Sequence, residues 1–545
     1  RNLTMRFDEV GGDHPGRITV TDSAGRPADI YNLNNYRLET VSGQNYNSRA
    51  IVRSITSNAK RDLGLSIPLT LKAGFDLRSE HRDITRPNYT RNFMGRDGIL
   101  RTDDDNAAQW YDPSYSQRDL LVGPRMQWYD LDKIGGEFRA NPGYFPMTET
   151  QMVNAYRSGI TTSQAITETI LAPYLRFDAK LMNGRLQLMG GMRYEHTNDK
   201  GQGPLIDPLA IYRRNAAGQI ERDAQGNRIV IAPISTVAGS QLAYKERQAQ
   251  VEKSYDGYFP SINLSYLIRE NLIARLSYGR SINRPDFGDI LPSMNLPDPE
   301  GTGRTITLTN PTLKPWIADS YGAALEYYFN EPSTGVLSAR VYQRDIKDFF
   351  GTQLIPARTE LLETYGIDPA IYGESQGYMI STDINVGDAR VSGMEFDYRQ
   401  NLTFLPRWAR GLTVFANLTL QHLEGSEMAT FNGFVGKTSN WGVTYSRERF
   451  SVRVAVNNRG LVKQAQIVTA GTEPGTFAYV LPRTTADVSA EYRFTRNVSF
   501  YVAGRNVTKE VDTNVRYGPS TARDHIITNN VHYAATWYVG VKGTF

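Results

Sequence analysis

Cysteine is absent from this 545-residue chain, and so are long hydrophobic runs. The lack of cysteine excludes disulfides, thiolate metal sites and cysteine nucleophiles. No stretch reaches the roughly 18 to 20 consecutive apolar residues that a transmembrane helix needs, so a helical membrane protein is excluded. The mean hydropathy of −0.46 is that of a polar chain. A membrane β-barrel still fits, because only alternate residues of its strands face lipid and the averaged signal is weak.

A block of one charge is also missing. The 61 lysines and arginines nearly balance the 57 acidic residues, and without a basic patch nucleic-acid binding gets no support. The six histidines are scattered without a ligand spacing such as His-x-x-x-His, and no Gly-x-Ser-x-Gly elbow occurs. We therefore expect no enzyme, cofactor or metal site, and haem capture is disfavoured.

Alternation with a period of two runs through the chain and is clearest at its end. Tyr533, Trp537, Val539 and Val541 fall on one face of the last segment, with polar side chains between them. Such a strand fits lipid on one side and water on the other. The same pattern recurs in about sixteen segments, the first two being Asn2–Glu9 and Val52–Asp62.

The connections between these segments distinguish a membrane barrel from a soluble β-sandwich, which also alternates. Short links rich in Gly, Asn and charge, such as Met182–Gly184 and Arg447–Arg449, alternate with links of up to 85 residues or so, such as His81–Thr167. Outer-membrane barrels have short periplasmic turns and long outer loops, and soluble domains seldom carry so many long loops. The sequence thus predicts an all-β, antiparallel outer-membrane β-barrel.

Several segments resemble TonB-dependent receptors, the gated importers of the outer membrane. In this family an Arg-Pro turn leaves one strand, and an Asn-Pro-x-Leu-Lys-Pro segment leads into the next. The matching segments are Tyr278–Phe287, Asn310–Pro315, Asp319–Phe329, Arg340–Phe349, Arg390–Tyr398 and Gly504–Val507.

The resemblance implies a 22-strand barrel with an N-terminal plug and a box that binds TonB, driven by inner-membrane motor proteins. Residues 1–545 would then be the C-terminal part of the barrel, and we expect a signal peptide, the plug and the first strands before Arg1. The terminal Phe545 resembles the signal that the barrel assembly machinery reads. We expect a place in the outer membrane of a Gram-negative bacterium, with lipid and lipopolysaccharide as neighbours. A passive porin or structural barrel is the alternative.

Aromatic residues in the longest predicted loop are the candidate ligand-binding groups, because aromatic faces stack on sugars or on catecholate ligands. The alternative is that these rings pack the loop against itself. The resemblance places oligosaccharides slightly ahead of ferric siderophores as the imported solute. The candidate residues are Trp110, Tyr111, Tyr115, Trp128, Tyr129 and Tyr144.

Charged residues on the other face of the strands are predicted to line the lumen, and in a receptor they would contact the plug. Their mixed signs favour plug contacts over a one-sign selectivity ring. This set comprises Arg275, Arg340, Arg344, Glu395, Asp397, Arg399, Arg453, Glu491 and Arg505. The acidic run Asp103–Asn106 in the longest loop is interpreted as a solvated turn rather than a cation site, because it lacks the Gly and Glu of a calcium loop.

Overall fold

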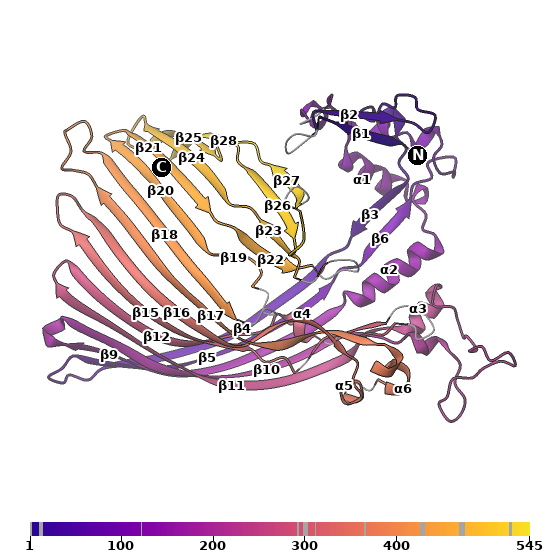
Figure 1. Ribbon diagram of the computed structural model, residues 1–545, viewed down its shortest axis with the longest axis horizontal. Coiled ribbons are helices and arrows are strands. Elements are labelled where there is room, and N and C mark those ends of the chain that lie inside the picture. The colour runs from indigo at the N-terminus through magenta and orange to yellow at the C-terminus, as the bar shows by residue number, and fades with distance from the viewer. Residues whose placement is uncertain are drawn as a thin grey trace.

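The computed structural model describes residues 3–9, 15–120, 123–291, 294–297, 304–310, 312–364, 367–425, 431–467, 473, 475–522 and 526–544. The long strands form one large, strongly curved sheet that resembles a trough (Figure 1). The N-terminal segment and most of the helices lie at one end of the trough.

Long antiparallel strands form this sheet, in chain order except where short strands intervene. They are β4 (Asn47–Asp62), β5 (Leu69–Thr85), β9 (Gln164–Leu181), β10 (Leu186–Ile206), β11 (Tyr244–Arg269), β12 (Leu272–Asn283), β15 (Trp316–Phe329), β16 (Gly335–Pro356), β17 (Met379–Asn401), β18 (Leu412–Gly425), β20 (Lys437–Arg447), β21 (Phe450–Arg459), β24 (Arg483–Arg493), β25 (Val498–Arg505) and β28 (Thr536–Gly543). The prediction of an antiparallel barrel sheet of about sixteen strands is confirmed. The segment Val52–Asp62 is part of β4.

The sheet has two edges. Strand β4 pairs with β5 and strand β28 pairs with β25, and within the described residues no register joins β28 to β4. The two edges stand apart in Figure 1, at the bottom and at the top of the trough. The strands of this chain therefore do not close a barrel by themselves, as the porin alternative would require.

The N-terminal segment is a correction to the prediction that residues 2–9 form a barrel strand. Strand β1 (Thr4–Asp8) pairs with β2 (Arg17–Thr21) in a separate two-stranded sheet. Its five residues are too few to cross a bilayer, which takes about 9 to 11 residues per strand. Its apolar residues Met5 and Phe7 alternate like those of a barrel strand, so the pattern alone was misleading.

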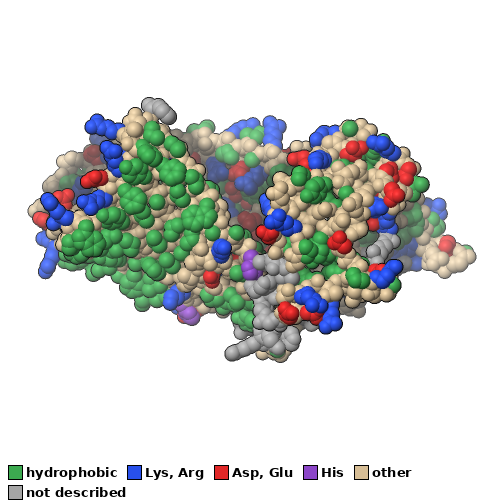
Figure 2. Space-filling model, turned by 90° about the horizontal axis from the view of Figure 1, so that it is seen from above, with side chains coloured by type: hydrophobic (Ala, Val, Ile, Leu, Met, Phe, Trp, Pro, Cys, Tyr) green, Lys and Arg blue, Asp and Glu red, His purple; other side chains and the backbone are tan. Residues whose placement is uncertain are grey.

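One face of the sheet carries the apolar side chains. On β28 the side chains of Trp537, Val539 and Val541 are 56%, 66% and 69% exposed, and Trp441 on β20 is likewise exposed. Figure 2 shows hydrophobic side chains gathered over the sheet end of the molecule, whereas the other end mixes charge and polar surface. Large apolar residues exposed in adjacent rows are the surface that a membrane barrel presents to lipid.

The two ends of the sheet differ as predicted. Tight links such as Met182–Gly184 close hairpins at one end, and Thr544 lies there too, donating its backbone N–H to Asn497 O. Phe545 itself lies outside the described residues. No helix among the described residues is long and apolar enough to cross a membrane.

At the other end, the strands continue well into segments that the alternation predicts as outer loops, such as Thr197–Tyr255 between β10 and β11. Strands β10 and β11 pair as far as Ile206 with Tyr244. A five-stranded sheet extends the last hairpins outward, and it consists of β19 (Phe434–Val435), β22 (Val462–Gln466), β23 (Phe477–Val480), β26 (Val511–Tyr517) and β27 (Ile527–His532).

The remaining outer segments fold into two small units. One includes α3 (Val237–Ala243), β13 (Met294–Asn295), β14 (Thr305–Leu308), α5 (Thr359–Thr364) and α6 (Pro369–Tyr372). A cluster that contains Ile306, Leu362 and Tyr378 forms its buried core. The other unit combines β3 (Thr40–Gln44), β6 (Asn88–Asn92), β7 (Tyr111–Asp112), β8 (Trp128–Tyr129), α1 (Leu131–Ala140) and α2 (Glu149–Thr161).

Candidate functional sites: an aromatic outer pocket and a charged inner wall

The long loop between β6 and β9 builds its own apolar core. Phe93, Trp110, Ile134 and Phe145 are buried together. The Phe93 ring centroid lies 5.2 Å from that of Trp110 and 4.9 Å from that of Phe145. Phe138 of α1 packs edge-on against Phe145, with ring centroids 5.2 Å apart, and so joins α1 to this core. Trp110, a member of the predicted aromatic set, therefore has a packing role.

An apolar pocket of about 260 Å³ lies beside this core. Of the six predicted binding residues, Trp110, Trp128 and Tyr129 line it. Tyr36 and Leu38 from the N-terminal segment complete its wall. The structure therefore brings half of the predicted set together with residues that lie about 70 to 90 positions earlier in the chain. No local sequence pattern could have linked the two groups.

The other three predicted aromatic residues lie outside the pocket lining. Tyr115 packs edge-on against Trp128, with ring centroids 5.6 Å apart, and the guanidinium of Arg118 lies 3.9 Å from its ring centroid. Tyr144 packs at the border of the loop core. The Tyr111 ring is partly exposed.

The charged side chains around the pocket are already paired. Arg37 Nη2 lies 2.8 Å from Asp103 Oδ1, and Arg101 Nη2 donates to Glu39 Oε2 at 2.7 Å. Gln127 Oε1 accepts the backbone N–H of Leu33 at 2.9 Å. The pocket thus offers ring faces more readily than free hydrogen-bonding groups.

The acidic run Asp103–Asn106 shapes the loop next to the pocket. Asp104 accepts hydrogen bonds from the Thr102 hydroxyl and from the backbone N–H of Arg96, and these hold the pKa of Asp104 below its usual value. Asp105 is fully buried, and burial raises the pKa of its carboxyl group. Within the described residues, no group of three or more potential ligand side chains is placed to hold a metal ion.

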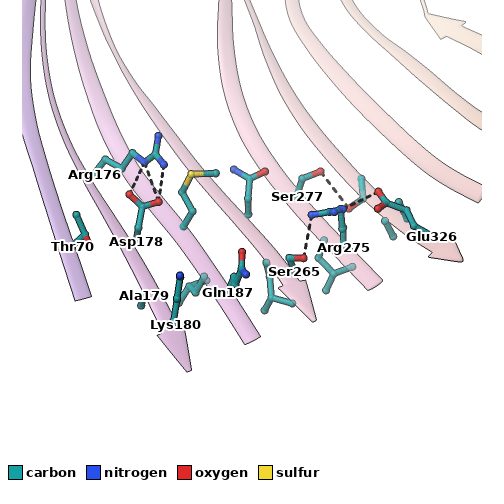
Figure 3. Close-up of a pocket in the computed structure, with 18 of the residues that line it drawn as sticks. Thr70, Arg176, Asp178, Ala179, Lys180, Gln187, Ser265, Arg275, Ser277 and Glu326 are labelled. Atoms are coloured by element: carbon teal, nitrogen blue, oxygen red, sulfur yellow. Dashed lines mark hydrogen bonds and ion pairs between the residues drawn. The ribbon is translucent and has the colours of Figure 1, made fainter. Parts of the chain in front are cut away.

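The concave face of the sheet is a charged wall, part of which Figure 3 shows in close-up. A cavity of about 710 Å³ lies along it. Arg176 and Asp178 point toward each other, as do Arg275 and Glu326, whose Nε and Oε1 atoms are 2.8 Å apart. Arg275 also donates to Ser265 at 3.1 Å.

The predicted lumen residues occupy this inner face, opposite the exposed apolar rows. Arg340 lies beside Glu395, with 3.8 Å between Nη1 and Oε2, and Lys542 binds Glu491 at 2.6 Å. Arg453 lies over the Phe415 ring. The other members, Arg344, Asp397, Arg399 and Arg505, alternate with lipid-facing residues in the same registers.

A row of carboxylates farther out on the same wall was not anticipated. Glu80 pairs in register with Glu168, and Glu168 with Asp199, on three neighbouring strands. Lys253 on β11 is the next residue in the row. Like charges directly opposite on neighbouring strands are destabilising, so this row needs cations around it.

Arg284 supplies the central cation. Its Nη2 donates to Glu195 and, at 3.0 Å, to Thr197 Oγ1, and its Nε lies 3.7 Å from Glu168 Oε2. Arg284 is the arginine of the Arg-Pro turn in the sequence. The sequence therefore marked this residue, but it did not show that Glu195 and Glu168 would be its partners. The following segment, 284–291, includes α4 (Phe287–Ile290) and packs apolar side chains on Ile166.

The comparisons with known proteins agree with this architecture. Residues 2–507 match the family model "TonB dependent receptor-like, beta-barrel", so the chain belongs to the β-barrel family of TonB-dependent receptors of the Gram-negative outer membrane. No curated protein matches the chain in sequence.

Solved structures of similar fold include the ferric-catecholate import receptor Fiu from K12 E. coli, with a TM-score of 0.52 and 13% identity over 92% of this chain and 55% of that one. The siderophore receptor PiuA from Acinetobacter baumannii has a TM-score of 0.49 and 12% identity over 92% and 56%. The hemophore receptor HasR of Serratia marcescens, solved with its hemophore HasA and heme, has a TM-score of 0.48 and 12% identity over 97% and 65%. The chain spans 55% of the length of the Fiu chain.

Proposed function

We propose that the protein imports a scarce solute across the outer membrane in a TonB-dependent manner. The observation that carries this proposal is the match of residues 2–507 to the receptor barrel family. An outer-membrane importer has no nucleotide at hand, so TonB and its inner-membrane motor proteins would supply the energy. Transport, rather than catalysis, is the activity that this architecture supports.

The inner wall supports the presence of a plug. Its pairs of opposite charge, such as Arg275 with Glu326 and Arg340 with Glu395, provide donors and acceptors on one concave surface. A polar domain seated there would find partners of both signs, whereas a pore selective for one ion sign favours a ring of one charge. Residues 1–545 are then the C-terminal part of a 22-strand barrel whose remaining strands separate β28 from β4.

The aromatic pocket is the proposed site of first contact with the solute. Trp110, Trp128 and Tyr129 offer ring faces within one 260 Å³ pocket. Stacking on the C–H faces of sugar rings would suit an oligosaccharide, the class that we place first. Ferric siderophores come second, because the ring of an aryl chelator would also stack on these aromatic faces.

Binding of the full-length receptor to a glycan panel and a siderophore panel tests this proposal. Saturable binding of oligosaccharides that weakens in a Tyr129→Ala variant is the expected result. Binding of iron chelates alone would overturn the oligosaccharide assignment. Uptake that persists in cells without TonB would contradict active import and favour a passive barrel.

A further inference from the structure

A row of charged side chains crosses the outer face of five neighbouring strands, β12, β15, β16, β17 and β18. The registers align Arg280 with Asp319, Asp319 with Asp345, Asp345 with Arg390, and Arg390 with Glu424. We call these five residues the outer charged row. All of them lie on the face of the sheet that carries the apolar side chains, not on the inner wall.

The belt of largely exposed apolar side chains ends below this row, and the next pair beyond it on β12 and β15, Ile282 with Ile317, is partly buried. One step toward the short turns, Tyr278 pairs with Tyr321, and their ring centroids are 5.3 Å apart. The next step brings Leu276, Val341 and Met394, all largely exposed. Aromatic side chains border the apolar band of membrane barrels at the interface, so the outer charged row lies at the level of the lipid headgroups on the side of the long loops.

The arginines of the row are held in place by carboxylates. Arg280 donates through Nε and Nη2 to the two oxygens of Asp319 at 2.9 and 3.0 Å, and the Tyr278 hydroxyl donates to Oδ1 of the same residue at 2.9 Å. Arg390 donates through Nε to Asp345 Oδ1 at 2.6 Å. Gln343 binds both oxygens of Asp345 at 3.1 and 3.0 Å.

These contacts leave much of each guanidinium unused. A guanidinium has five N–H donors, whereas the contacts with Asp319 and Asp345 occupy only two atoms of Arg280 and one of Arg390. Lys347 lies two residues beyond Asp345 on the same face of β16. Its ammonium group makes no hydrogen bond or close ion pair with the residues that the structure describes, and its charge acts on the Asp319 carboxylate of the row.

We propose that Arg280, Arg390 and Lys347 bind the phosphate groups of the glycolipid of the outer leaflet. Guanidinium groups that carboxylates have already oriented can form charge-assisted, paired hydrogen bonds with phosphate oxygens. The position of the row fixes the source of the phosphate. A headgroup whose acyl chains lie on Leu276, Val341 and Met394 reaches these cations without leaving the bilayer, whereas a soluble phosphate gains nothing from the belt. This assignment is independent of the imported solute.

Native mass spectrometry of the full-length receptor in detergent tests this assignment. The probes are diphosphoryl lipid A, monophosphoryl lipid A and inorganic phosphate. We expect the diphosphoryl form to bind most tightly, and the Arg280→Gln/Arg390→Gln/Lys347→Gln variant to lose roughly tenfold or more of that affinity, since each cation near a lipid headgroup contributes measurably. A matched variant, Arg213→Gln/Arg214→Gln/Lys245→Gln, removes the same charge from the outer loops and should change binding less than about twofold.

The outcomes separate the alternatives. Equal affinity of the wild type for the two lipid A forms would overturn the proposal, and so would equal affinity of the wild type and the triple variant for the diphosphoryl form. Binding of inorganic phosphate as tight as that of lipid A would replace the lipid site with a free anion site. If the triple variant does not fold, the charge-conserving Arg280→Lys/Arg390→Lys variant replaces it, alongside the comparison of the two lipid A forms on the wild type. The lysine variant should bind diphosphoryl lipid A more tightly than the single glutamine variants do, and weaker binding would overturn the proposal.

Discussion

Arg284 provides the sharpest test of the inner wall. In Arg284→Gln the cation between Glu195 and Glu168 is lost, and the carboxylates of the row are left opposite one another. Removing one partner of a fully buried ion pair costs about 3–5 kcal/mol. Because the Arg284 side chain retains 22% exposure, we expect a smaller cost of about 2–3 kcal/mol, reduced from the buried-pair range for solvent screening.

This cost should appear as local opening of residues 284–291 rather than as loss of the barrel. Local opening energies set amide protection, so 2–3 kcal/mol corresponds to roughly 30- to 160-fold faster hydrogen exchange in this segment. Arg185→Gln is the matched control, because the Arg185 side chain donates to the Ile268 carbonyl group at the short-turn end and to no other group in the described part of the chain.

A double-mutant cycle completes the test. If Arg284 acts through Glu195, the Arg284→Gln/Glu195→Gln variant should lose clearly less protection than the sum of the two single variants, with a coupling of about 1–3 kcal/mol. Unchanged exchange in Arg284→Gln would refute the reasoning that this arginine neutralises the carboxylates around it. Strictly additive effects would refute its pairing with Glu195.

Three further predictions concern the belt and the outer loop. Val454→Arg, on the lipid face of β21, should destabilise the barrel by about 2–4 kcal/mol in vesicle refolding. Ala455→Arg lies at the same depth but faces Asp487 across the register, so it should cost far less. Equal costs would contradict the assignment of the two faces. Trp110→Ala should destabilise the loop core by about 3–5 kcal/mol and make the loop more sensitive to protease. Tyr129→Ala should weaken ligand binding and leave the rate of proteolytic cleavage of the loop unchanged. Because burial raises the pKa of Asp105, the folded state binds more protons than the unfolded state. The loop should therefore lose stability as pH rises above the usual aspartate pKa. Asp105→Asn should flatten this dependence when loop proteolysis is measured from about pH 4 to 7, the window that follows from the usual aspartate pKa.

Period-two alternation predicted the sheet and its apolar face because one side of every strand meets lipid and the other meets water. The pattern failed for residues 2–9 because Met5 and Phe7 alternate in a local hairpin as they would in a barrel. It also set the outer ends of β10 and β11 too early, since beyond the membrane neither face needs to be apolar and the alternation fades.

The sites depended on contacts between distant segments, which the sequence does not encode locally. Trp110 and Trp128 could be predicted as binding residues because they are aromatic residues of one loop. Tyr36 lies in a distant part of the sequence and comes next to them only in the folded structure. In the same way, Glu80, Glu168 and Asp199 form a row only once the strand registers are known.

The most direct measurement is a cysteine scan along β21, for which residues 1–545 contain no competing cysteine. Single cysteines at positions 450 to 459 would carry a spin label in the receptor reconstituted in lipid, with accessibility to oxygen and to a water-soluble nickel complex recorded at each position. The structure predicts oxygen maxima at Phe450, Val452, Val454 and Val456 and nickel maxima at the residues between them. Accessibilities without a period of two, or with the two faces exchanged, would contradict a strand that faces lipid on one side and a wet lumen on the other.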